Sequence, residues 1–335
     1  EMASPLAALK HDRVVVLLIA AVVGVVYAAT RTQPPTGDSL LAAMAVERGD
    51  PASLLIPHRL LIQPLGWAFV QAWSAVGWTG GALLPLQVLS ALGGGAAAAL
   101  LFAIGRRLTG STRAGLVAAA GFAVSAGAWS FGTDAEPVLL PLALALVPIW
   151  GLLRVGPAPS PRHAALLGGV TALVILAYLT AAALVPVLAV GLLLAGSLTP
   201  RQRLRRAVVF LGVVVMIVVP LYLLVMIVAF GVRDLQALQA WRTYGGLSES
   251  GTPYGRVTWA NLPYGAYGLL RTLAWYSPVR LGESTAAYLA GATWPERAAL
   301  AAADARPSGL LTQAARDDGL GCALVGDRPA KTDFY

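Results

Sequence analysis

Two polar segments of this sequence carry side chains that could do acid–base chemistry. The first, TGDSLLAAMAVERGDP, contains Asp38, Glu47 and Asp50, and the second, WSFGTDAEP, contains Asp134 and Glu136. A carboxylate can act as a general base that takes the proton of a hydroxyl group, and it can also hold a divalent cation such as Mg²⁺ or Mn²⁺. We therefore take Asp38, Asp134 and Glu136 as the candidate catalytic residues.

A basic pair follows the first acidic segment, in the sequence IPHRLL. His58 and Arg59 could bind the phosphate of a lipid through charge-assisted hydrogen bonds, or they could simply anchor the chain at the membrane interface. Glu47 and Trp67 flank this pair; Glu47 could also pair with Arg48, and Trp67 suits the headgroup level of a bilayer. These four residues are the candidates for binding a substrate or a lipid phosphate.

The three candidate acids also have structural roles open to them. Asp38 stands where a helix through Leu40 and Met44 would begin, so its side chain could cap that helix. Asp134 and Glu136 stand just before Pro137, which suits the first turn of a helix, where the helix dipole favours negative charge. A capping role and a catalytic role are compatible for each of them.

The composition shows what kind of molecule must position these residues. Hydrophobic residues make up 57% of the chain, charged residues make up 12%, and the mean hydropathy is +0.71, which together indicate an integral membrane protein. Six stretches contain no Asp, Glu, Lys or Arg, and most approach the roughly 20 residues that a helix needs to cross a bilayer. They are residues 14–29, 81–105, 114–131, 137–153, 164–197 and 207–230.

The lengths of these stretches set the number of crossings. Residues 164–197 would form a helix of about 50 Å, too long for one bilayer, so we expect two short helices with a turn near Tyr178. We expect residues 60–78, with three tryptophans, to form a helix in the outer interface and not a further span. The predicted fold is an all-α polytopic integral membrane protein with about seven transmembrane helices and interfacial helices at the outer face.

With this arrangement the strongly basic loops all lie on one side, which the positive-inside rule assigns to the cytoplasm. The residues concerned are Lys10, Arg13, Arg106, Arg107, Arg113, Arg154, Arg162, Arg201, Arg203, Arg205 and Arg206. The N-terminus is then cytoplasmic in the cell (inner) membrane, and the acidic loops lie outside. The net charge of +8 reflects orientation, and we expect no nucleic-acid partner.

This topology divides the chain into two parts. Residues 1–230 form the predicted transmembrane domain, with outer loops at 30–80 and 132–137. Residues 231–335 form an outer-face aromatic segment, in which Trp241 and Trp259 could line a sugar-binding surface or lie in an aromatic belt, followed by a loosely structured tail. The single cysteine, Cys322, leaves no partner for an internal disulfide and no zinc cluster built on cysteine.

The order of these parts resembles the GT-C superfamily of polytopic membrane glycosyltransferases, in particular the dolichyl-phosphate-mannose protein mannosyltransferases and the bacterial lipid A aminoarabinose transferases. The similar elements follow one another along residues 14–230. They are TGDSLL, the Pro-Leu-aromatic element IQPLGWAFVQAW, the basic doublet that ends LQVLSALGGGAAAALLFAIGRRLTGS, and the acidic turn of SFGTDAEPVLLPLALAL.

The resemblance implies an enzyme that transfers a sugar from a polyprenyl-phosphate carrier to a hydroxyl group of a glycan, lipid or protein at the outer membrane face. The catalytic acid of the family falls on Asp38, and the acid of its second loop falls on Asp134 or Glu136. The family often places a basic residue before the Pro-Leu element to hold the carrier phosphate. Gln63 stands at that place here, so we assign phosphate binding to Arg59. Family members usually continue further, so we expect either a truncated chain or a small divergent member.

Other classes of function remain open at this point. In a non-catalytic scaffold or lipid-binding subunit, the outer acids would only cap helices. A transporter is a third class, but ion-coupled transporters usually carry an ionisable residue inside the membrane, and the apolar stretches of this chain have none.

Overall fold

The computed structural model describes residues 5–33, 35–136, 138–155, 159–194 and 196–234, together with residue 237. Within this part of the chain the fold is all-helical and contains no strand. The predicted aromatic segment around Trp241 and Trp259, and the tail with Cys322, lie outside the described residues.

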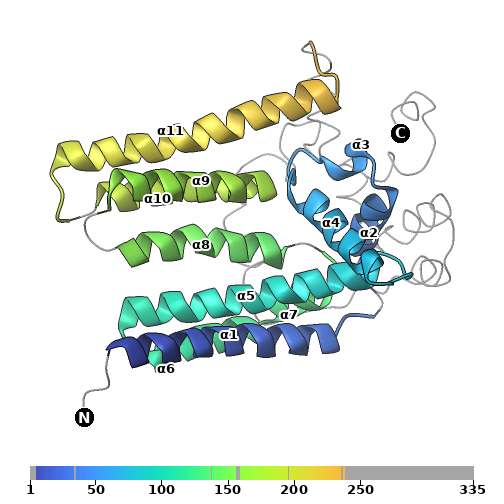
Figure 1. The fold of residues 1–335 in the computed structure, drawn as a ribbon, viewed down its shortest axis with the longest axis horizontal. Coiled ribbons are helices and arrows are strands. Elements are labelled where there is room, and N and C mark those ends of the chain that lie inside the picture. The colour runs from blue at the N-terminus through green and yellow to red at the C-terminus, as the bar shows by residue number, and fades with distance from the viewer. Residues whose placement is uncertain are drawn as a thin grey trace, which may run out of the picture.

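Most of the helices lie side by side as a bundle, and three further helices gather at one of its ends (Figure 1). The bundle consists of α1 (Pro5–Ala29), α5 (Leu83–Thr109), α6 (Thr112–Ala123), α7 (Ala126–Thr133), α8 (Leu139–Val155), α9 (Pro161–Ala177), α10 (Leu184–Leu193) and α11 (Pro200–Leu224). The helices at this end are α2 (Gly37–Arg48), α3 (Pro51–Leu54) and α4 (Ile62–Ala75).

Two helices are long and apolar enough to cross a membrane by length and composition: α5 and the segment Pro200–Ala229, which comprises α11 and its π-helical extension. A third crossing results if α6 and α7, which meet at an angle of 63°, form one broken span. Shorter apolar helices fill the rest of the bundle. The described part of the chain is therefore compatible with integration into a membrane.

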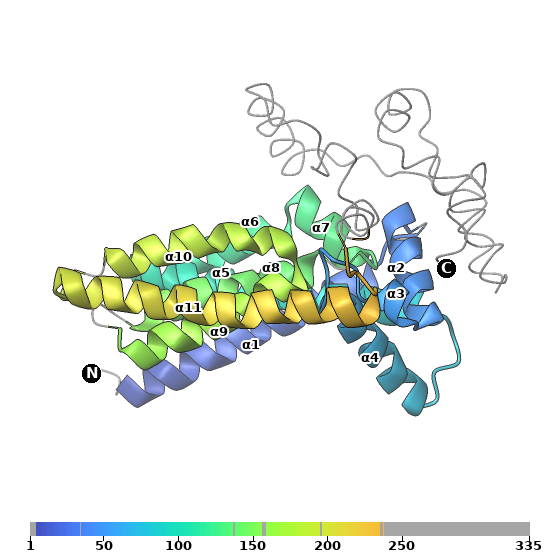
Figure 2. The same cartoon turned by 90° about the horizontal axis from the view of Figure 1, so that it is seen from above.

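The break expected in the stretch 164–197 is confirmed. Helix α9 ends at Ala177, a 3₁₀ turn covers Leu179–Ala183, and α10 begins at Leu184. Helix α4 occupies most of residues 60–78; it lies with α2 and α3 at the end of the bundle and leaves the bundle at an angle (Figure 2). The break after α9 and the helices α2, α3 and α4 thus belong to the same end of the molecule.

Glycines allow the central helix α5 to approach its neighbours closely. A Cβ atom at Gly95 would collide with the backbone carbonyl of Ala20 in α1, and one at Gly93 would lie 2.6 Å from the backbone nitrogen of Leu140 in α8. Because backbone atoms cannot move aside as a flexible side chain can, these positions admit only glycine without a shift of the helices. The GGG sequence therefore fixes α1 and α8 against α5.

Arginines occupy the end of the bundle opposite α2–α4. The guanidinium of Arg107, at the end of α5, donates to the carbonyl of Leu153 in α8 over 3.2 Å. Arg203, in the first turns of α11, donates to the carbonyls of Leu198 (2.8 Å) and Gly196 (3.1 Å) in the preceding loop. These cations satisfy carbonyls that the end of α8 and the loop before α11 leave unpaired.

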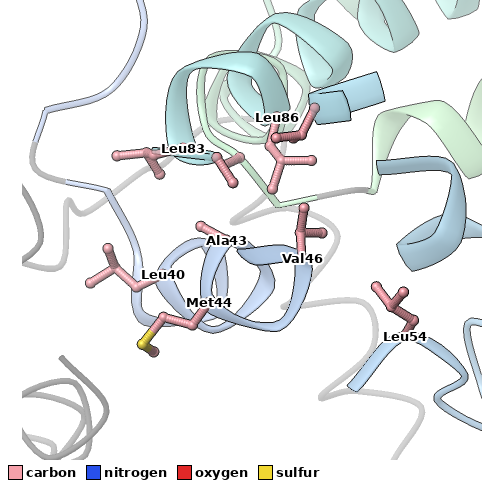
Figure 3. Close-up of a cluster of buried hydrophobic side chains, with 10 residues drawn as sticks. Leu40, Ala43, Met44, Val46, Leu54, Leu83 and Leu86 are labelled. Atoms are coloured by element: carbon pink, nitrogen blue, oxygen red, sulfur yellow. The ribbon is translucent and has the colours of Figure 1, made fainter. Parts of the chain in front are cut away.

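A small hydrophobic core holds α2 in place at the other end. Leu40, Met44 and Val46 of α2 are buried together with residues of α5 and α3. In Figure 3, Val46 points toward Leu86 and Ala43 lies across from Leu83, while Leu54 approaches from the side of α3. This packing presses one face of α2 onto the beginning of α5 and leaves the opposite face free for the first acidic residue.

Candidate functional site

Asp38 lies in the first turn of α2 and is exposed. Its predicted capping role is wrong: the helix begins one residue before it, and the N-cap is Thr36, whose Oγ1 accepts the Ser39 N–H over 3.3 Å. The backbone of Thr36 is extended, as an N-cap requires, and its hydroxyl leaves the carboxylate of Asp38 without a capping task. Among the described residues, no hydrogen bond or ion pair holds the Asp38 carboxylate.

Asp134 has a different environment, because it is only 1% exposed. One of its oxygens, Oδ2, accepts the backbone N–H of Thr36 over 3.0 Å, and the other, Oδ1, accepts that of Ala135 over 2.8 Å. Helix α8 begins only at Leu139, so Asp134 does not lie in its first turn; it ends α7 instead. This buried carboxylate ties the second acidic loop to the residue that begins α2.

Further hydrogen bonds join the same two loops. The backbone N–H of Thr32 donates to the carbonyl of Thr133 over 2.8 Å, and the hydroxyls of the two threonines lie 2.7 Å apart. Gln87 of α5 donates its amide to the carbonyl of Thr32 over 3.1 Å. We call this set of contacts, together with those of Asp134, the loop clasp. It fixes the position of Asp38 relative to the second loop.

Glu136 follows the clasp and is partly buried. The pKa of its carboxyl is raised from 4.5 to about 7, mainly by burial; the negative charges of Asp38 and Asp134 also raise this pKa, and the positive charge of Arg59 lowers it. The structure thus brings together acids and a cation from two segments that stand far apart in the sequence. Near neutral pH, Glu136 can either hold a proton or accept one.

Arg59 lies between the acids and the break after α9. Its guanidinium carbon is 5.5 Å from the centre of the Tyr178 ring, which suits a cation–π contact. The Nε of Arg59 is buried and has no hydrogen-bond partner among the described residues. A buried donor without an acceptor costs about 1–3 kcal/mol. An anionic ligand bound here would therefore stabilise the site by giving the Arg59 Nε an acceptor.

The segment that carries Arg59 is fastened to the helix ends around it. Leu61 N–H donates to the carbonyl of Leu176, and Leu179 N–H donates to the carbonyl of His58, both over 3.0 Å. These bonds use backbone groups that the end of α9 leaves free. The Tyr222 hydroxyl of α11 donates to the carbonyl of Pro57 over 2.8 Å. The break predicted near Tyr178 is therefore the place where the segment that carries Arg59 docks.

The remaining predicted residues do not join this group. Glu47 accepts the backbone N–H of Ala82 over 2.8 Å just before α5, and Asp50 forms an ion pair with Arg48 and caps α3. Trp67 is 39% exposed, and its indole nitrogen lies against Gly49. His58 is partly buried and contributes its carbonyl to the docking described above. The described residues contain no cluster of three or more His, Cys, Asp or Glu that could hold a metal ion.

Sequence reasoning missed Ser90 and the contact of Tyr178 with Arg59, and it named Gln63 only as the residue that stands where the family often has a basic one. Gln63 and Ser90 are 4% and 2% exposed, and both lie within apolar helical stretches. An isolated polar residue in such a stretch was the only available signal. In comparisons with known proteins, no family model, curated protein or solved structure matches the chain.

Proposed function

We propose that the chain is a membrane glycosyltransferase of the GT-C type, which transfers a sugar from a polyprenyl-phosphate carrier to a hydroxyl acceptor at the outer face of the cell membrane. The observation that supports this proposal best is the grouping of Asp38, Glu136 and Arg59 at one end of an apolar helical bundle. An exposed carboxylate, a proton-holding carboxyl and a cation whose Nε lacks a partner are the groups that this transfer needs.

In the proposed reaction, Asp38 acts as the general base. The acceptor oxygen forms a bond to the anomeric carbon while the bond from that carbon to the phosphate oxygen breaks, and the hydroxyl proton passes to Asp38. The anomeric configuration is inverted. Asp38 suits this role because it is exposed and because the clasp holds its helix in place.

Arg59 neutralises the polyprenyl phosphate as it leaves, through donors that approach from beside Tyr178. Glu136 orients the acceptor, since a carboxyl with a pKa of about 7 can donate or accept a hydrogen bond at neutral pH. Asp134 becomes a positioning residue, because both of its oxygens are occupied by backbone N–H groups. An Mg²⁺ or Mn²⁺ ion is not needed for these roles.

The proposed topology has seven crossings, made by α1, α5, α6 with α7, α8, α9, α10 and α11. The arginine-rich end, with the N-terminus, lies in the cytoplasm, and α2, α3 and α4 lie at the outer face. Opposite placement of the arginines and the acids along the bundle supports this orientation. A carrier lipid could then reach Arg59 from the bilayer, and an acceptor could reach Asp38 from water.

A non-catalytic membrane scaffold is the second candidate, and one observation favours it. Three carboxylates of the outer loops already have structural partners: Glu47 at α5, Asp50 at α3 and Asp134 in the loop clasp. The scaffold interpretation extends this pattern to Asp38 and Glu136.

The test is turnover of radiolabelled polyprenyl-phosphate sugars by the purified protein in lipid nanodiscs. The proposed function expects free polyprenyl phosphate and labelled product to appear together. A scaffold would bind the carrier lipid without releasing sugar, and a transporter would move a solute across sealed vesicles without breaking the glycosyl bond. Either of these results would refute the proposal.

A further inference from the structure

A small crevice lies beside the acidic group, between α2, α4, α5 and the second acidic loop. Its cavity volume is about 10 Å³, and two of its lining residues are polar, Gln63 and Ser90. A cavity of roughly this size holds one water molecule or one group of similar size, such as a hydroxyl. The crevice is therefore too small for a sugar ring and large enough for one of its substituents.

Gln63 is the notable residue in the crevice. Its side chain is 4% exposed, and among the described residues no hydrogen bond involves its amide. Part of the small exposed surface lies on the amide itself, because its nitrogen and oxygen are not among the fully buried, unpaired side-chain atoms of the described residues. Gln87 gives the matched comparison, since it is equally buried but donates to the carbonyl of Thr32.

Ser90 complements the Gln63 amide from the facing helix. Its hydroxyl donates to the backbone carbonyl of Glu136 over 3.1 Å, which leaves its lone pairs as acceptors. An amide offers both a donor and an acceptor, so Gln63 and Ser90 together can satisfy a group that both donates and accepts. A hydroxyl has this property, whereas an ammonium cannot accept and a carboxylate cannot donate.

The crevice is directly connected to the proposed catalytic residues. Ala135, which lines it, stands between Asp134 and Glu136. Ala42 also lines it and stands about one helical turn after Asp38 on α2. Gln63 follows Arg59 by four residues at the beginning of α4. A sugar whose phosphate contacts Arg59, and whose anomeric carbon is near Asp38, thus has the crevice within reach.

We propose that this crevice is a specificity subsite, in which the Gln63 amide binds one uncharged hydroxyl of the donor sugar. The inference rests on the proposed function for the identity of the ligand. The substrate class that follows is a polyprenyl phosphate carrying a neutral sugar, with a hydroxyl and not an amino or carboxylate group at the recognised position.

The experiment compares Gln63→Leu with Gln87→Leu in nanodiscs. The probes are polyprenyl-phosphate mannose, glucose and galactose and the monodeoxy analogues of each, and both donor binding and transfer are measured. The wild type should prefer a parent sugar over one of its deoxy analogues by about tenfold or more, and Gln63→Leu should remove this preference. Gln87→Leu should keep it.

The thermal unfolding midpoint gives a second readout that does not depend on activity. Gln63→Leu removes an amide that makes no hydrogen bond to the described residues, so the midpoint should change little. Gln87→Leu leaves the Thr32 carbonyl unpaired, so the midpoint should fall. A fall of similar size in both variants would mean that Gln63 is held by the protein itself, and this would overturn the inference.

The outcomes separate the two proposals. Transfer with an unchanged preference in Gln63→Leu would mean that the crevice holds only water; it would refute the subsite and leave the glycosyltransferase standing. Discriminating binding without transfer by the wild type would refute the enzyme and support the subsite. No discrimination by the wild type in either binding or transfer would refute the subsite as well.

Gly66→Ala, which adds a methyl group to the crevice lining near Leu86, should weaken binding of the parent sugar more than of the deoxy analogue.

Discussion

Replacement of Glu136 by glutamine should stabilise the protein at neutral and alkaline pH, and it should have little effect near pH 4.5. The pKa of the Glu136 carboxyl is raised from 4.5 to about 7, first by burial and then by the charge of Asp38. In the folded protein the carboxyl therefore keeps its proton up to about pH 7, whereas in the unfolded chain it loses the proton near pH 4.5. The folded state binds more protons between these values, so its stability falls as the pH rises through this window.

The size of the effect follows from the difference in pKa. One pH unit corresponds to about 1.4 kcal/mol, so the ionised carboxylate destabilises the fold by about 2–3 kcal/mol above pH 7, once solvent access to the partly buried side chain is taken into account. Glutamine has nearly the same shape and never ionises. The backbone carbonyl that accepts from Ser90 is kept in the variant.

The assay is the thermal or chemical unfolding of the wild type and of Glu136→Gln in the same detergent, at several pH values from 4.5 to 8.5. All other titrating groups are common to both proteins and cancel in the difference. We expect the two proteins to be about equally stable near pH 4.5 and the variant to be more stable at pH 8. A difference that does not change with pH would refute the reasoning, as would a variant that is less stable at pH 8.

Three further predictions test the surroundings of this residue and the bundle. Arg59→Gln removes the charge that lowers the pKa of Glu136, so the fall in stability as Glu136 ionises should end at a higher pH than in the wild type in the same unfolding assay. A shift to lower pH would contradict the placement of Arg59. Asp134→Ala leaves two backbone N–H groups without acceptors and should cost roughly 3 kcal/mol in free energy of unfolding, and a loss below about 1 kcal/mol would contradict the loop clasp. Gly95→Ala should strongly lower the unfolding midpoint, whereas Gly121→Ala, where an added Cβ meets nothing within 4 Å, should leave it nearly unchanged; equal effects would refute the close approach of α1 and α5.

Much of the helical layout could be predicted from the sequence, because long uncharged stretches and their lengths allow few arrangements in a bilayer. The break after Ala177 was predictable in this way, since residues 164–197 are too long for one helix. The placement of α4 beside α2 at the end of the bundle also agrees with its tryptophan-rich pattern. The charge and the length of a stretch are properties of many residues together and can be read directly from a single sequence, so they predict helix positions well.

The roles of individual acids could not be predicted in the same way. Asp38 and Asp134 look alike in the sequence, yet one is exposed and the other is buried with both oxygens occupied. Glu47 was predicted to pair with Arg48 or to bind substrate, and its carboxylate instead accepts the N–H of Ala82, 35 residues later in the chain. Such partners are set by tertiary contacts, which no local pattern of residue types encodes.

The pairing of Arg59 with Tyr178 has the same origin. Arg59 was predicted as a cation for a phosphate, but its buried Nε and its contact with an aromatic ring depend on the docking of the first loop on the end of α9. Gln63 shows most clearly what the sequence cannot reveal. A glutamine at the start of an apolar helix points to a binding site only once its burial and its hydrogen bonds are known.

Sugar transfer by Asp38→Asn, compared with transfer by Asp50→Asn, tests the central claim most directly. Both variants remove one carboxylate from the first acidic segment, but Asp50 pairs with Arg48 and caps α3, whereas no hydrogen bond or ion pair among the described residues holds Asp38. The proposed mechanism predicts that, with a polyprenyl-phosphate donor in nanodiscs, Asp38→Asn keeps its fold and its donor binding and loses at least about a hundredfold in turnover, while Asp50→Asn retains most of it. Equal turnover by the wild type and Asp38→Asn would contradict it.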